Sequence, residues 1–196
     1  MLDCLKYIDQ TVFLFLNGFH CPFFDLVMYW GTQSLVWLPL YLFLLFLVIR
    51  LYKWQTFWIL MFAALMIIVS DQLSNIFKDW VARPRPTYEP GLPIIHTVNG
   101  YLGGQFGFYS AHASTNLAIA VFLICIFQKR FRYFYPFIIA WAFFMAYTRI
   151  YLGVHYPGDI IGGWIAGGLI GWGFGILTMW YISRGIQQTR IKNHWD

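Results

Sequence analysis

Long apolar segments limit what this chain can fold into. A helix needs about 20 apolar residues to cross the hydrocarbon core of a bilayer. Five segments have that length and composition: 35–52, 55–77, 111–128, 133–152 and 158–181. Only 11% of the 196 residues are charged, whereas a soluble domain has about 25%. The sequence therefore predicts an all-α integral membrane helical bundle, with a single domain over residues 1–196.

The N-terminal segment 1–31 has a different pattern. Within residues 2–16 the apolar side chains repeat at helical spacing, and polar residues including Asp9 fall on the other face. This pattern predicts an amphipathic helix that lies in the membrane interface. Residues 23–30 are apolar but too short to span alone, so they form either a re-entrant arm or an extension of the first span. We therefore expect five to six transmembrane helices. The segment lacks the features of a cleaved signal peptide, so we expect it to be retained.

The basic residues predict the orientation of the bundle. Loops rich in lysine and arginine remain on the cytoplasmic side of a membrane. Eight of the 13 basic residues follow the first, third and fifth spans: Arg50, Lys53, Lys129, Arg130, Arg132, Arg184, Arg190 and Lys192. We expect these connections to be cytoplasmic, in an inner-membrane protein. The long connection 79–109 then lies on the periplasmic, extracytoplasmic side, where we expect it to form an ordered cap over a site.

Composition also argues against two kinds of partner. The net charge is +5, but the basic residues form no exposed stripe, so we expect no nucleic-acid partner. The three cysteines, Cys4, Cys21 and Cys125, show no CxxC or Cys/His spacing, so no metal site is predicted.

Several cations break the charge rule at the extracytoplasmic side. Lys78 ends the second span, Arg85 follows it, and Arg149 lies near the end of the fourth span. Each residue alone could simply extend its head to the interface. Three of them on the disfavoured side instead indicate a phosphate site, because arginine and lysine stabilise charge on phosphoryl oxygens. Arg83 could join this phosphate site or reach a second phosphate, but we expect it to be solvated or to face lipid headgroups.

A second stretch places a serine and a histidine at the start of the third span. Ser110 is suited to cap a helix that begins near Ala111. The free N–H groups of a helix N-terminus bind anions. His112 and Asn116 would then lie on the face that meets the anion. The alternative is a serine cap with an incidental histidine.

A third stretch contains His155 and, four residues later, Asp159. Pro157 suits the start of a helix, so Asp159 falls in its first turn. A carboxylate there can accept the proton of one imidazole nitrogen and leave the other as a nucleophile. A helix-start preference would explain Asp159 but would leave His155 unexplained.

These three stretches resemble the motifs of the type 2 phosphatidic acid phosphatase family, membrane lipid phosphatases whose active site is shared with vanadium haloperoxidases. The family pattern is K-x6-R-P, P-S-G-H and S-R-x5-H-x3-D. The first motif is intact in residues 78–86, whereas Tyr109, Ala111 and Thr148 replace the proline, glycine and serine of the other two. The resemblance covers about residues 55–180, the expected catalytic core.

The resemblance implies a role for each motif residue. His155 would attack phosphorus and form a phosphohistidine, Asp159 would orient it, and His112 would act as the general acid. The phosphate-binding residues would be Lys78, Arg85, Ser110, Ala111 and Arg149. Neither a metal nor another cofactor is implied.

The expected function is hydrolysis of a membrane lipid phosphate or diphosphate. Undecaprenyl diphosphate is the expected substrate from the resemblance and the orientation, with phosphatidylglycerol phosphate and lipid A phosphates as alternatives. A lipid-to-lipid phosphotransferase would use the same residues. An anion transporter or channel would leave the His155–Asp159 pair unexplained. Among the other polar residues, we expect Asp71 to be paired in the interior and His20 and His96 to lie on the surface.

Overall fold

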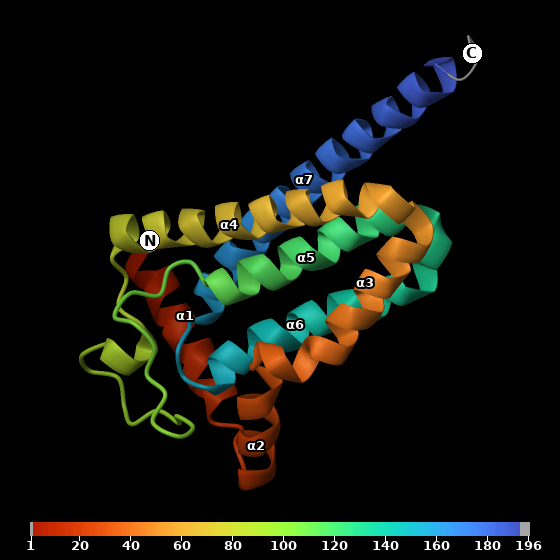
Figure 1. Ribbon diagram of the computed structural model, residues 1–196. Helices are drawn as coiled ribbons and strands as arrows, with labels where there is room; N and C mark the ends of the chain where they lie inside the picture. Colours follow the sequence, from red (N-terminus) through yellow and green to blue (C-terminus); the bar gives the residue numbers. More distant parts are fainter. Residues whose placement is uncertain (1, 193–196) are drawn as a thin grey trace.

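The computed structural model describes the backbone of residues 2–192 and the side chains of residues 3–184. The side chains of Arg190, Lys192 and His194 lie outside that part. Every regular element described is helical (Figure 1). Seven α-helices follow one another along the chain: α1 (Leu2–Asn17), α2 (Pro22–Gly31), α3 (Leu38–Tyr52), α4 (Thr56–Val81), α5 (Ala111–Phe127), α6 (Tyr135–Tyr151) and α7 (Pro157–Lys192). Short 3-10 turns lie between them: η1 (Ser34–Trp37), η2 (Lys53–Gln55), η3 (Pro86–Tyr88) and η4 (Gln128–Phe134).

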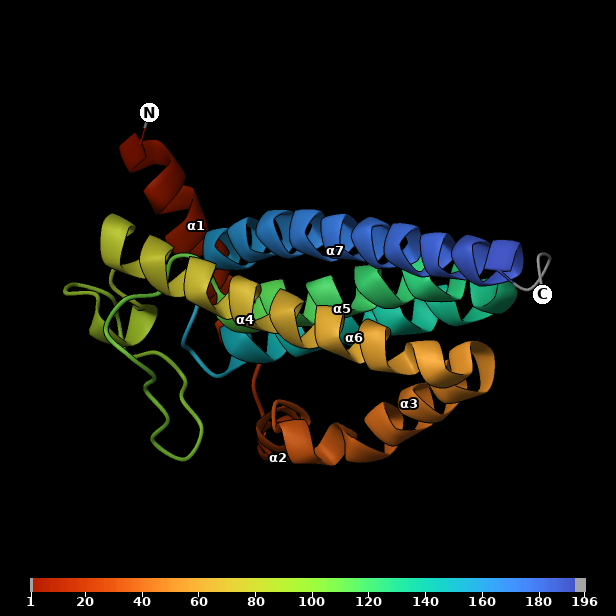
Figure 2. The same cartoon turned by 45° about the horizontal axis from the view of Figure 1, so that its top comes forward.

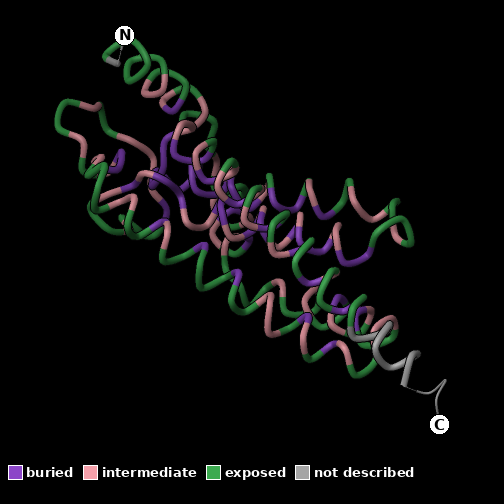
Figure 3. The backbone as a smooth tube through the Cα atoms, turned by 90° about the horizontal axis from the view of Figure 1, so that it is seen from above, coloured by how far each residue is buried: buried purple, intermediate pink, exposed green. Residues whose placement is uncertain are grey.

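Helix α5 lies at the centre of the bundle, with α4, α6 and α7 packed around it (Figures 1 and 2). Its apolar side chains, including Phe122 and Ile126, form the largest buried cluster with Met66, Trp141 and Met145. Figure 3 shows the buried positions along the inner faces of the helices and the exposed ones outside. The five apolar segments predicted from the sequence coincide with α3 to α7, and the all-α prediction is confirmed.

Three helical stretches are long and apolar enough to cross a membrane: Ser34–Val81, Ala111–Tyr151 and Pro157–Arg184. The first two each turn back on themselves, at η2 and η4, to give the pairs α3–α4 and α5–α6 (Figure 1). Helices α1 and α2 also pass this test together, but they are bent by 113°. If that pair is one broken span, the number of candidates rises to four.

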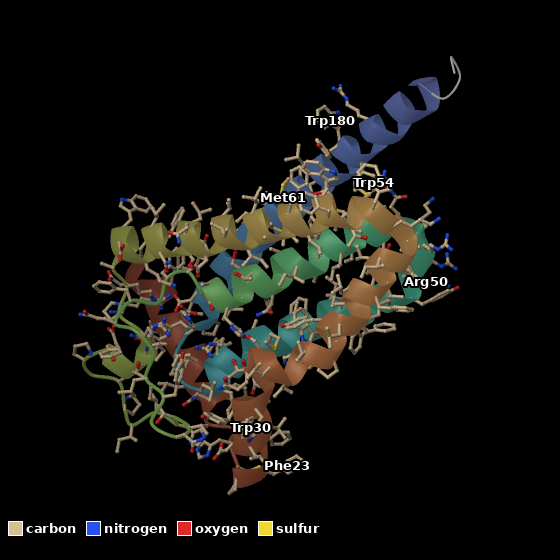
Figure 4. All side chains as sticks on the ribbon, in the orientation of Figure 1. Phe23, Trp30, Arg50, Trp54, Met61 and Trp180 are labelled. Carbon is tan, nitrogen blue, oxygen red and sulfur yellow. The ribbon has the colours of Figure 1, made fainter. Side chains whose placement is uncertain are left out.

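Large apolar side chains cover the outside of the bundle. Figure 4 shows Phe23, Trp30, Trp54 and Trp180 pointing away from it, and each of them is about half exposed or more. Soluble proteins rarely expose large contiguous apolar areas. Lipid chains are the environment that suits such a surface.

Glycines let α7 approach α5 closely. A Cβ atom added to Gly163 would lie 2.6 Å from the backbone oxygen of Ser110, and one added to Gly175 would lie 2.5 Å from Cβ of Cys125. Gly167 and Gly171 lie in the same way against the backbone of α5. The small-residue spacing therefore serves packing within the bundle, as it does in many membrane helix pairs.

The N-terminal helix is more buried than its pattern predicts. Leu5 and Ile8 are exposed, which suits an interfacial helix, but Phe13 is fully buried against Tyr156. Asp9 faces the protein, although its spacing predicts a polar outer face. The reason is charge pairing with the 79–109 connection, which a single-helix pattern does not contain.

The prediction that His96 lies on the surface is wrong. Its side chain is only 17% exposed, with Nε2 lying 2.7 Å from Oδ1 of Asp25 in α2. Its ring stacks on that of His20, with centroids 3.9 Å apart. Asn17 accepts the backbone N–H of His96 and donates to the carbonyl groups at the end of α6. These contacts anchor the long connection to α1, α2 and α6.

The glycine packing predicts different costs at two neighbouring positions in α7. In the Gly171→Ala variant the new methyl group meets the backbone of Ala118, so we expect a loss of about 1–3 kcal/mol in the free energy of unfolding. In Gly173→Ala the methyl group enters open space, and the better helix propensity of alanine leaves stability unchanged or slightly higher. Thermal unfolding of the two variants in detergent compares them. Equal stability would contradict the close packing of α7 on α5.

Candidate active site

The predicted site residues gather at one end of the bundle, where α4 ends and α5 and α7 begin (Figure 1). A cleft of about 410 Å³ opens there. Its lining includes six of the eight predicted site residues: Lys78, Arg85, Ala111, His112, Arg149 and His155. The other two, Ser110 and Asp159, are fully buried and support the lining residues.

Three cations face the cleft without a carboxylate partner. Lys78 donates to Oγ of Ser74 and Oδ1 of Asn75, both at 3.2 Å. No ion pair within the described part of the chain includes Lys78, Arg85 or Arg149. Cations held together in a partly buried site repel one another. Such a cluster attracts a multiply charged anion.

The two arginines are held by a few contacts each. Arg85 is 9% exposed, and its Nε donates to the carbonyl oxygen of Phe106 at 3.1 Å. Arg149 is 8% exposed and donates to Oγ1 of Thr32 and to the hydroxyl of Tyr101, both at 3.1 Å. The buried Nη1 of Arg85 and Nε of Arg149 find no acceptor among the described residues. These donors remain available to the oxygens of an anion.

Arg85 is positioned by the connection between α4 and α5. Its backbone N–H donates to the carbonyl oxygen of Gln105 at 3.0 Å, and Pro84 forms an isolated β-bridge with Phe106. Gly103, with a φ of +69°, leaves room for the guanidinium. Burial and the neighbouring charge of Arg149 lower the pKa of Arg85, which remains protonated as arginine does in proteins. The two ends of the long connection therefore meet at the site.

The start of α5 is built as the sequence predicts. Ser110 caps the helix by accepting the N–H of Ala113 at 3.4 Å, and Ala111 begins it beside the cleft. Nε2 of His112, in the first turn, lies 3.5 Å from Oγ1 of Thr32. The backbone N–H of Ser110 donates to the carbonyl oxygen of Asp159 at 3.0 Å, which joins the starts of α5 and α7.

His155 and Asp159 lie together at the start of α7. Oδ2 of Asp159 lies 3.4 Å from Nδ1 of His155, a long contact of the kind that often shortens when substrate binds. The same Oδ2 accepts the N–H of Tyr156 at 3.0 Å, as one half of a capping box. With Nδ1 facing Asp159, Nε2 is the nitrogen left on the other side of the ring.

Burial keeps His155 in its neutral form. The side chain is 3% exposed, and burial lowers the pKa of His155 to about 4, although the Asp159 carboxylate acts in the opposite direction. Arg85 and Arg149 lower the pKa of His155 further. A neutral imidazole has a free electron pair on one nitrogen, which a nucleophile requires.

The prediction that Arg83 is solvated or faces headgroups is wrong. Its Nη1 donates to Oδ1 of Asp159 at 2.9 Å, and its Nη2 donates to Oδ2 of Asp9 at 2.7 Å. Its side chain is only 20% exposed. Asp9 is 74 residues away in the chain, so no local pattern indicates this pairing.

The structure adds Thr32, Tyr101 and Asp71 to the site. Thr32 and Tyr101 hold Arg149, and neither carries a motif that would predict this. Asp71 was expected to be paired in the interior. It is instead exposed to the cleft that Lys78 lines, and among the described residues its carboxylate accepts one hydrogen bond, from the amide of Asn75 at 3.4 Å. The expectation of a buried pair is therefore wrong, because α4 turns this face toward the cleft.

The chemistry of the site follows from these side chains. Three cations and buried donors can hold a tetrahedral anion, and a neutral histidine oriented by a carboxylate can attack it. Among the described residues, no group of three or more histidine, cysteine, aspartate or glutamate side chains could hold a metal ion.

Relatives of known activity share most of the chain. The present chain is 42% identical over 178 residues to a lipid A 4'-phosphatase of Bacteroides thetaiotaomicron, and this match covers 89% of the chain and 78% of that protein. It is 34% identical over 174 residues to a lipid A 4'-phosphatase of Porphyromonas gingivalis, and this match covers 86% of the chain and 72% of that protein.

Solved structures share the fold. The phosphatidylglycerolphosphate phosphatase of Bacillus subtilis, a transmembrane enzyme of the PAP2 type, matches 92% of this chain and 87% of its own, with a TM-score of 0.66 and 21% identity. LpxE of Aquifex aeolicus matches 86% of this chain and 93% of its own, with a TM-score of 0.61 and 22% identity. The sequence profile of the PAP2 superfamily matches residues 59–185. The chain therefore belongs to the PAP2 superfamily and is a membrane lipid phosphatase.

Proposed function

We propose that this protein hydrolyses a phosphomonoester of a lipid A-type glycolipid. The curated relatives named above are lipid A 4'-phosphatases. They favour this substrate over undecaprenyl diphosphate, the substrate expected from the sequence. The observation that carries the proposal is the cleft itself, where three cations without carboxylate partners face the His155–Asp159 pair.

The first step is binding of the phosphate. Lys78, Arg85 and Arg149 neutralise its charge, and the N-terminus of α5 at Ser110 and Ala111 adds helix N–H groups. Arginine can meet two oxygens at once, whereas lysine acts as a point charge. The available donors of Arg85 and Arg149 support this assignment.

The second step is transfer to histidine. Nε2 of His155 attacks phosphorus and forms a P–N bond while the P–O bond to the lipid breaks. Asp159 accepts the Nδ1 proton in a hydrogen bond and stabilises the positive charge that develops on the ring. His112, in its protonated form, gives its proton to the departing lipid oxygen and becomes neutral. Water then attacks phosphorus with neutral His112 taking its proton, the P–N bond to His155 breaks, and free phosphate leaves.

The polar side chains in part of the cleft lining support a sugar headgroup. Asp71, Thr115 and Asn116 line it together with the cations. Asp71 precedes Lys78 by seven residues on α4, about 10 Å along the helix axis. The carboxylate of Asp71, which is exposed to the cleft, can accept from hydroxyl or amide groups beside the phosphate of a glycolipid, and a plain phosphomonoester of an alcohol lacks these groups.

The distribution of charge supports an extracytoplasmic site. Arg50 lies at the end of the bundle opposite the cleft (Figure 4). Lys53 in η2 and the basic residues of η4 belong to the turns at that end. Loops of this charge stay in the cytoplasm. We therefore place the cleft at the periplasmic face, with α3 to α7 each crossing the bilayer and the bent α1–α2 pair as a possible sixth span.

A substrate comparison tests the proposed lipid. Purified protein in detergent, given lipid A, phosphatidylglycerol phosphate or undecaprenyl diphosphate, should release phosphate with the highest kcat/KM from lipid A. His155→Ala provides the blank. Faster release from either other lipid would contradict the substrate, and a requirement for a second lipid would identify a phosphotransferase.

The nucleophile has its own test. We expect His155→Ala to lose activity by about 10³-fold or more, because a nucleophile has no substitute in the cleft. Acid-quenched wild-type protein should contain phosphohistidine at position 155 by mass spectrometry. Phosphate attached to another residue, or retained activity in His155→Ala, would overturn this assignment.

The burial of His155 predicts an unusual titration. Below its pKa the ring is protonated and cannot attack, so the nucleophile should remain competent as the pH falls from neutral to about 4. Nitrogen-15 NMR of histidine-labelled protein, with His155→Gln to assign the signal, measures this midpoint. A midpoint near the ordinary value of about 6.5 would contradict the buried environment.

A further inference from the structure

We propose that Arg83 and Asp9 are positioning residues for the His155–Asp159 pair, so that the N-terminal helix α1 is part of the catalytic assembly. This inference rests on the proposed role of His155 as the nucleophile. It concerns two residues that lie outside the cleft. Arg83 occupies a variable position of the first motif, and Asp9 lies outside all three motifs.

Arg83 connects two carboxylates from distant parts of the chain. It donates to Oδ1 of Asp159 at 2.9 Å and to Oδ2 of Asp9 at 2.7 Å. Its guanidinium also lies 4.1 Å from the centre of the Tyr156 ring, where it gains a cation–π interaction. The Asp159 side chain is 0% exposed, and those of Asp9 and Arg83 are 15% and 20% exposed. Ion pairs as buried as these hold their geometry better than pairs on the surface.

The two oxygens of Asp159 have different partners. Oδ1 accepts from Arg83, whereas Oδ2 accepts the N–H of Tyr156 and faces Nδ1 of His155. Arg83 and the N–H of Tyr156 thus hold one oxygen each and set the plane of the carboxylate. Arg83 therefore determines how Oδ2 is presented to the nucleophile, although it does not line the cleft.

Asp9 holds the other side of Arg83 and the start of α7. Its Oδ1 accepts the backbone N–H of Gly158 at 2.7 Å, in the first turn of α7, where a negative charge is favourable. A Cβ atom at Gly158 would lie 2.7 Å from Oδ2 of Asp9, so the approach requires glycine. Helix α1 thus contacts the element that carries Asp159.

The opposite charges of Arg83 and Asp9 predict opposite effects on Asp159 when each residue is replaced. Asp9 takes up part of the charge of Arg83, so Asp159 remains able to accept the Nδ1 proton of His155. Removing the positive charge of Arg83 should strengthen Asp159 as a hydrogen-bond acceptor. Removing the negative charge of Asp9 should weaken it. The other groups that act on His155 stay the same in both cases: Arg85 in the long connection, Arg149 in α6 and His112 in α5.

Two variants test the proposal, with para-nitrophenyl phosphate as a soluble substrate. For Arg83→Gln and Asp9→Asn we expect kcat to fall about 10–100-fold with KM unchanged. This is the effect expected of residues that orient a reacting group by hydrogen bonds without contacting the substrate. The histidine-155 NMR titration should move to higher pH in Arg83→Gln and to lower pH in Asp9→Asn. Arg83→Lys, which keeps the positive charge, should recover part of the kcat.

Lys6→Gln is the matched control. Lys6 also joins α1 to the long connection, through Glu89 at 2.6 Å, but it does not contact Asp159. We expect its kcat and its histidine titration to match those of the wild type. The inference is overturned if the two test variants shift in the same direction, if they keep wild-type kcat, or if Lys6→Gln loses as much activity. If the proposed function itself were wrong, the result would be different, because the wild type would show no activity that depends on His155.

Discussion

This site depends on the hydrogen bonds that hold the buried carboxylate of Asp159. One oxygen faces His155 and the N–H of Tyr156, and the other accepts from Arg83. The backbone oxygen of the same residue accepts from Ser110 at the start of α5. A fully buried carboxylate is stable only when its oxygens are bonded in this way. These bonds join the long connection, α5 and α7, and Asp9 links α1 to the same arginine.

The second constraint is the excess of positive charge in the cleft. Burying Lys78, Arg85 and Arg149 near one another costs free energy in the absence of an anion. That cost is recovered when a phosphate binds, and more so as its charge spreads in the transition state. Burial lowers the pKa of His155, and the charges of Arg85 and Arg149 lower it further. The two arginines that face the cleft therefore also help to keep His155 neutral.

Single segments of the sequence predict most of the helices and of the cleft residues, but they do not predict contacts between distant segments. The apolar runs predict α3 to α7, and the motif spacing indicates which residues line the cleft or support it. The predictions for Arg83, His96 and Asp71 were wrong, because their environment comes from segments far away in the chain. Thr32 and Tyr101 carry no motif, and only the folded chain places them beside Arg149.

The sequence by itself determined the helices and the kind of chemistry. Apolar length and the order of motif residues are local properties, and the hydrophobic effect and helix capping act on them directly. Only the tertiary structure decided how Asp159 is held. Its partner Arg83 lies 76 residues away along the chain, and Asp9, which holds Arg83, lies 74 residues further from it. Ion-pair energy falls with distance in space, whatever the separation in sequence. That is why α1, which its sequence pattern alone predicts to be a membrane-surface helix, lies beside the His155–Asp159 pair.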